Sequence, residues 1–334
     1  MSKKQIILKE LKKWLDDELI DQEIYSKLSS QYNVGQWDFA VIIRGCLVIG
    51  SIVLGVGIIS LLTLILESLY FLAFILTILF ILSFVFGVML TEKKWKIYLP
   101  KTGNAIIVVA CLILCADIFT IAKIIFPQGG NWSILLLINS IIYFFIAYIR
   151  KNRVVLVLAL IFIASWFGAQ TGYVSDWGFY FFGMSYPMRF AVVSPILILI
   201  GYLHKKILPE VYFNFSKVYY VMGALYTNLS LWILSIIGNS EKILFSSENY
   251  HLELLFYSII WLMFNIIIFI IGAKYKNKIF TGFAIVFVIL NLYTRYFEYF
   301  WDKFDKSLFF IILGSITITI GIFLEKKLKK LNKS

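Results

Sequence analysis

Residues 291–314 read NLYTRYFEYFWDKFDKSLFFIILG, and they place charged and aromatic side chains between two hydrophobic segments. The charged side chains include Arg295, Glu298, Asp302 and Asp305. Almost all of the remaining chain reads as apolar stretches long enough to cross a bilayer, joined by short connections. The quoted stretch therefore reads as the connection between two membrane-spanning helices, and the rest of the chain repeats this pattern.

The composition supports the same conclusion. Hydrophobic residues make up 61% of the 334 residues, charged residues make up only 15%, and the mean hydropathy is +0.88. A soluble globular domain of ordinary composition does not reach these values. The sequence predicts an all-α fold, a polytopic membrane bundle of about ten transmembrane helices. The predicted spans are residues 41–66, 69–91, 104–126, 132–149, 154–170, 188–204, 216–238, 253–273, 279–297 and 307–324.

The positive charges predict how these spans are oriented. If the N-terminus is cytoplasmic, 25 Lys and Arg residues lie in segments on the inner side and 6 lie near the outer side. Cytoplasmic loops are enriched in Lys and Arg, so both termini are expected in the cytoplasm of a bacterium and the bundle in its inner membrane. The net charge of +12 then reflects topology and the anionic inner leaflet, and no nucleic-acid partner is expected. No signal peptide is expected either, because residues 41–66 lack a small-residue cleavage site.

The chain is predicted to contain one membrane domain with short additions at its ends. Residues 1–36 form a cytoplasmic helical hairpin, residues 37–325 form the bundle, and residues 326–334 form a basic cytoplasmic tail. Asp21 can cap the second helix of the hairpin. Two short helices bury little surface, so residues 1–33 are expected to dock on the membrane, on a second copy or on a protein partner. A solvated basic leader explains the same residues.

Four segments together resemble a known family. They are LKKWLDDELIDQEIYSKLSSQY (11–32), ADIFTIAKIIFPQGGNW (116–132), ASWFGAQTGY (164–173) and NLYTRYFEYFWDKFDKSLFFIILGSITITIGIFLEKK (291–327). They resemble the bacterial predicted membrane proteins grouped as domain of unknown function 2157. The resemblance implies a polytopic membrane protein with a cytoplasmic helical hairpin at the N-terminus. It implies no assigned activity and no catalytic residue.

Ionisable and polar side chains gather near the predicted outer ends of the spans, where an ionisable group is a candidate for function. One interpretation is an outward-facing polar cavity in which Asp117 faces an arginine. The other is a structural ion pair that holds the helices together. In both cases we expect Asp117 to pair with Arg295 first and Arg189 second, and Arg295 to pair with Glu298, three residues further on. The candidate cluster comprises Asp117, Lys123, Gln170, Arg189, Arg295 and Glu298.

Three asparagines, Asn139, Asn228 and Asn265, lie near the middle of predicted spans. Amides at this depth usually form hydrogen bonds between helices, and this is the expected role. Coordination of a solute is the alternative.

Enzyme and metal signatures are missing from the sequence. It contains no phosphate loop, dinucleotide fingerprint, HExxH motif or GxSxG elbow. His204 and His251 have no neighbour at ligand spacing, and Cys46, Cys111 and Cys115 lie in apolar runs without a partner ligand. We therefore expect no metal and no cofactor, and an enzyme is the least favoured class of function.

Three functions remain open. The first is binding or transport of a small solute or lipid component through an outward-facing polar cavity. The second is a structural or signalling scaffold whose N-terminal hairpin binds a partner. The third, which has the least support, is an intramembrane transferase acting on a lipid-linked substrate.

Overall fold

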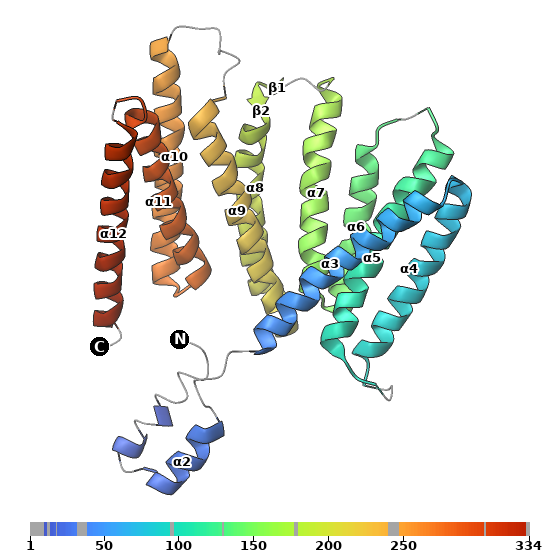
Figure 1. The fold of residues 1–334 in the computed structure, drawn as a ribbon, viewed down its shortest axis with the longest axis horizontal. Coiled ribbons are helices and arrows are strands. Elements are labelled where there is room, and N and C mark those ends of the chain that lie inside the picture. Colours follow the sequence, from blue (N-terminus) through green and yellow to red (C-terminus); the bar gives the residue numbers. More distant parts are fainter. Residues whose placement is uncertain are drawn as a thin grey trace. The chain divides into compact units, whose positions relative to one another are not determined.

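The computed structural model describes residues 10–11, 14–17, 19–31, 39–93, 97–128, 130–176, 180–239, 247–303 and 305–331. Most of these residues are helical, which confirms the predicted all-α membrane bundle. The chain divides into two compact units, Met1–Pro127 and Gln128–Ser334 (Figure 1). The division falls between the third and fourth predicted spans.

Among its described residues, unit 1 contains the short helix α2 (Gln22–Gln31) and three long apolar helices. The backbone N–H of Ile24, in α2, donates to the Asp21 carboxylate at 2.7 Å, as expected of an N-cap. The long helices are α3 (Phe39–Ile65), α4 (Leu69–Thr91) and α5 (Pro100–Ile125). The first helix of the predicted hairpin lies largely outside the described residues, so the hairpin remains a prediction.

Helices α4 and α5 form the tightest helix pair in unit 1. A Cβ atom added to Gly103 would lie 2.7 Å from the carbonyl oxygen of Gly87, so only glycine permits this backbone approach. Further along the pair, Leu72 and Leu76 of α4 pack against Ile113 of α5. The two helices are therefore in close contact along much of their length.

Within the described residues, unit 2 contains seven long helices, and successive helices run antiparallel (Figure 1). The elements are α6 (Ser133–Arg150), α7 (Arg153–Val174), α8 (Tyr186–Ile207), the 3₁₀ helix η1 (Glu210–Tyr212), α9 (Phe213–Ile237), α10 (Ser247–Lys274), α11 (Lys278–Phe300) and α12 (Lys306–Leu331). The short connections from α6 to α7 and from α10 to α11 are built alike. Lys151 and Lys276 follow the first helix of each pair with positive φ, and Asn152 and Asn277 accept hydrogen bonds from the N-terminus of the next helix.

A small β-hairpin connects α7 to α8. Strands β1 (Tyr180–Phe181) and β2 (Met184–Ser185) pair in antiparallel register. Phe182 and Gly183 between them both have positive φ, as a two-residue hairpin turn requires. This hairpin was not predicted from the sequence.

Nine helices in the described part of the chain are long and apolar enough to cross a membrane, namely α3 to α11. The starts and ends of these helices lie within a few residues of the predicted spans. Helix α12 covers the tenth predicted span, but its apolar part within the described residues is the shorter segment Lys306–Ser315. The tenth span therefore remains a prediction.

Candidate functional site

Asp117 is a buried carboxylate within the membrane-spanning part of unit 1. Its side chain lies on α5 and is 4% exposed. The hydroxyl of Thr77, on α4, donates a hydrogen bond to Asp117 Oδ2 at 2.8 Å. The second carboxylate oxygen, Oδ1, is buried without a hydrogen-bond partner. Asp117 thus combines one protein hydrogen bond with one unsatisfied acceptor.

Arg189 lies buried in unit 2 at the start of α8, with 1% exposure. Its Nε donates to the Met184 carbonyl at 2.9 Å, and its Nη1 donates to Thr171 Oγ1 at 3.1 Å. The guanidinium also lies over the rings of Tyr186 and Phe181, at 4.3 and 5.4 Å from their centroids. Arg189 therefore joins the β-hairpin to the ends of α7 and α8.

The hairpin is also tied to the connection between α9 and α10. Asn239 accepts a hydrogen bond from the Ser185 backbone N–H at 2.8 Å and donates one to the Gly183 carbonyl at 3.0 Å. Its own backbone N–H donates to Glu253 of α10 at 2.7 Å. This arrangement, together with Arg189, closes one end of unit 2 with charged and amide groups.

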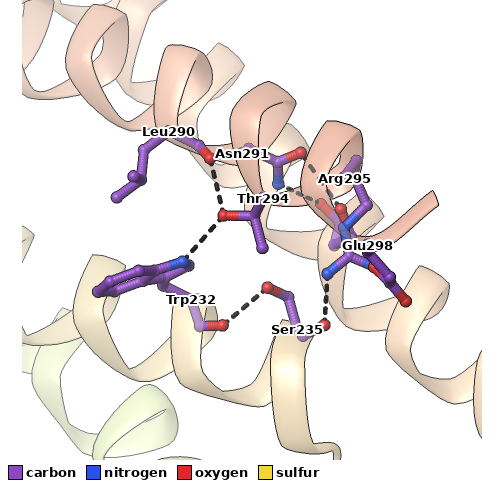
Figure 2. A network of polar contacts seen from close by, with 8 residues as sticks. Trp232, Ser235, Leu290, Asn291, Thr294, Arg295 and Glu298 are labelled. Carbon is purple, nitrogen blue, oxygen red and sulfur yellow. Dashed lines mark hydrogen bonds and ion pairs between the residues drawn. The ribbon is translucent and has the colours of Figure 1, made fainter. Parts of the chain in front are cut away.

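Arg295 belongs to a second polar network, between α9 and α11 (Figure 2). It forms an ion pair with Glu298, which confirms the predicted pairing across one helical turn. It also donates to the Ser235 carbonyl on α9, and Trp232 donates from its indole N–H to Thr294 Oγ1 at 3.0 Å. These contacts join the two helices near their predicted outer ends.

Gln170 and Lys123 have different environments. The Gln170 amide oxygen accepts hydrogen bonds from Asn131, at 2.9 Å, and from Ser133, which joins the end of α7 to the start of α6. Lys123 is exposed in the last turn of α5. Gln170 is therefore part of the packing of unit 2, whereas Lys123 lies on a surface.

Two of the three central asparagines form the expected contact between helices. Asn228 Oδ1, on α9, accepts from Trp261 Nε1 at 2.9 Å and from Asn265 Nδ2 at 2.8 Å, both on α10. All three side chains are fully buried. Asn139 instead donates to the Leu135 carbonyl within its own helix, so no described hydrogen bond of Asn139 joins two helices.

The sequence did not indicate one further cluster, at the other end of unit 2. His204 is buried there among the rings of Tyr148, Phe215 and Tyr219. The Tyr148 hydroxyl lies 2.9 Å from the Tyr219 hydroxyl and 3.5 Å from His204 Nδ1. Aromatic residues spaced along α6 and α9 were the available signal, but only the fold shows that they meet at His204.

The predicted cluster is therefore divided between several places. Gln170 lies in the last turns of α7, and Arg189 of α8 donates to Thr171 beside it. Arg295 and Glu298 lie on α11, and Arg295 joins that helix to α9. Asp117 belongs to the other unit, so its pairing with Arg295 or Arg189 remains a prediction. Within the described residues, no group of three His, Cys, Asp or Glu side chains is placed to hold a metal ion.

Comparison with known families supports the resemblance seen in the sequence. The model of a family described as "Predicted membrane protein (DUF2157)" matches the chain. Residues 12–156 carry that match. The resemblance to DUF2157 is thus confirmed for the part of the chain from α2 to the beginning of α7, while residues 291–327 lie beyond it. No curated protein and no solved structure matches the chain.

Proposed function

We propose that this multi-pass membrane protein binds or moves a small solute, and that Asp117 binds the positively charged part of that solute. The observation that supports this function is the unsatisfied Oδ1 of a carboxylate that is 4% exposed within a membrane-spanning helix. A central acidic residue disfavours insertion by roughly 2.5 to 3.5 kcal/mol on insertion scales, so carboxylates at this depth usually serve a function. The solute class is a proton, a monovalent cation or a small amine.

The hydrogen bond from Thr77 supports this role. A hydroxyl that donates to Oδ2 orients the carboxylate and leaves the lone pairs of Oδ1 for a cation or proton. A divalent ion would need more oxygen ligands than these two side chains provide. The proposal therefore favours a singly charged solute.

The polar contacts of unit 2 favour the second function, a structural or signalling scaffold. Arg189, Arg295, Asn228 and Asn265 all form hydrogen bonds with neighbouring helices or loops, as expected of groups that hold a bundle together. On this alternative, Asp117 is another structural group and its substitution changes stability alone.

Flux measurements distinguish the two functions. The full-length protein is reconstituted in liposomes with an imposed proton or sodium gradient, and a pH-sensitive or sodium-sensitive dye reports its decay. Wild-type protein should dissipate one of these gradients at least severalfold faster than the Asp117→Asn variant. Lys123→Gln is the control, because it removes an exposed charge from the same helix. Equal decay for wild type and Asp117→Asn with both ions and with a methylammonium gradient would reject the proposal and favour the scaffold.

A further inference from the structure

Two basic turns lie side by side at the end of unit 2 where α6 leads into α7 and α8 leads into α9. We call this surface the basic end. Its exposed lysines are Lys151, between α6 and α7, and Lys205, Lys206 and Lys217, at the end of α8 and in the first turns of α9. Arg150 and Arg153 flank Lys151 in the connection between α6 and α7.

Buried aromatic contacts fix the position of one turn against the other. Tyr148 lies two residues before Arg150, and its ring contacts Tyr212 of η1 at 5.8 Å and His204 of α8 at 5.6 Å between centroids. Its hydroxyl lies 2.9 Å from that of Tyr219 on α9. Because side chains in such a cluster are closely packed, the two turns that carry the cations are held near each other.

The basic end has little negative charge of its own. Among residues 145–155 and 200–219, Glu210 is the single acidic residue. Several cations held close together repel one another, and an anion that binds among them relieves this repulsion. This surface therefore favours an anionic ligand.

Exposed apolar side chains continue from the basic end along the same two helices. Phe145 and Ile149 are exposed on α6, and Tyr202, Leu203 and Ile207 are exposed on α8. Both helices are long and apolar enough to cross a membrane. A soluble anion would use only the cations, whereas a phospholipid would use the cations and the apolar side chains together.

We propose that the basic end binds the phosphate headgroup of an anionic phospholipid, with acyl chains lying along α6 and α8. Lysines and arginines between helices at the membrane surface are a recognised basis of such binding. The inference does not depend on the role of Asp117, which lies in the other unit. It is also independent of orientation, since it requires only that the basic end lies at one surface of the bilayer.

Native mass spectrometry of the full-length protein in detergent tests this site. Phosphatidylglycerol is titrated against phosphatidylcholine with matched chains, and the retained lipid gives an apparent Kd. The variant Lys151→Gln/Lys205→Gln/Lys206→Gln should weaken phosphatidylglycerol binding about tenfold or more, because each lysine near a phosphate contributes to affinity. The matched control Lys274→Gln/Lys276→Gln/Lys278→Gln removes three charges between α10 and α11 and should change the Kd less than twofold.

One charge-retaining variant and two soluble anions test the same site further. The variant Lys151→Arg/Lys205→Arg/Lys206→Arg should keep the wild-type Kd within about twofold, since it retains the charge. Glycerol phosphate and polyglutamate represent a free phosphate and an acidic protein partner, and neither should displace phosphatidylglycerol at equal concentration. Equal weakening by both glutamine variants, loss of binding in the arginine variant, absence of preference over phosphatidylcholine, or displacement by either soluble anion would overturn the lipid site.

Discussion

Two buried ionisable side chains, Asp117 in unit 1 and Arg189 in unit 2, differ in how completely they are satisfied. Asp117 in unit 1 has one hydroxyl partner and one unsatisfied oxygen. Arg189 in unit 2 has a carbonyl, a hydroxyl and two aromatic rings around it. A buried charge with several partners from different elements stabilises the fold, while a buried charge that lacks partners lowers stability. The comparison therefore favours a structural role for Arg189 and agrees with the solute-binding role proposed for Asp117.

The largest effect is expected at Arg189. Arg189→Gln removes a charged donor that bonds both Met184 and Thr171, so the free energy of unfolding should fall by about 2 to 4 kcal/mol. Unfolding of the purified protein by denaturant titration measures the change. The free energy of unfolding of Arg189→Lys should lie between those of the wild type and Arg189→Gln, because lysine keeps the charge but cannot reproduce the planar fork of donors. A change below about 0.5 kcal/mol in Arg189→Gln would contradict the structural assignment.

The two central asparagines should differ from each other. Asn228→Ala removes the acceptor of both Trp261 and Asn265 and should lower the free energy of unfolding by about 1 to 2 kcal/mol. Asn265→Ala removes a donor to Asn228 together with an unsatisfied oxygen, so its cost should be smaller. The same denaturant titration compares them, and the opposite order would show that another group satisfies Asn265.

Asp117 should show the reverse of Arg189, with little effect on stability. Asn at this position still accepts the Thr77 hydrogen bond and removes a buried charge, so Asp117→Asn should change the free energy of unfolding by less than about 0.5 kcal/mol or raise it. The expected loss is in ion flux. A loss of several kcal/mol would instead indicate a charged partner.

The predicted ion pair between Asp117 and Arg295 gives that outcome a direct test. A double-mutant cycle with Asp117→Asn and Arg295→Gln should be non-additive if the two side chains pair, because the second change removes a charge already left alone. Additivity within about 0.5 kcal/mol would rule out the ion pair, and the Asp117 carboxylate would then be available to bind the proposed solute. Denaturant titration of the four proteins supplies the cycle.

The smallest effect is expected at the start of α12, on the other side of the turn from Arg295. The Ser307 backbone N–H donates to Asp305 at 2.8 Å, and this hydrogen bond lowers the pKa of the Asp305 carboxyl below its ordinary value. A carboxylate whose pKa is lowered by folding stabilises the fold fully when the pH is above the ordinary pKa of about 4. This contribution disappears as the pH falls through the lowered pKa. The protection factors of the first amides of α12, which correct the exchange rates for the intrinsic effect of pH, should therefore fall below about pH 4, and Asp305→Ala should remove that pH dependence.

The sequence predicted the helices well because the signals are local. Long apolar runs define each helix within a few residues. Contacts between helices were less predictable. The pair Arg295 and Glu298 was correct because its spacing lies within one helical turn. The environment of Arg189 and the aromatic cluster around His204 depend on residues distant in the chain, which periodicity does not report.

The close approach of Gly87 and Gly103 has a consequence for biosynthesis. Helices α4 and α5 are neighbours in the chain, so they can pair while the ribosome is still synthesising unit 2. We expect that pairing to bring Thr77 beside Asp117 during translation, so that this hydrogen bond forms before unit 2 is complete. A substitution at either glycine would delay the pairing of α4 with α5. The nascent chain would then expose the Asp117 side chain to the bilayer at the stage when membrane quality control acts.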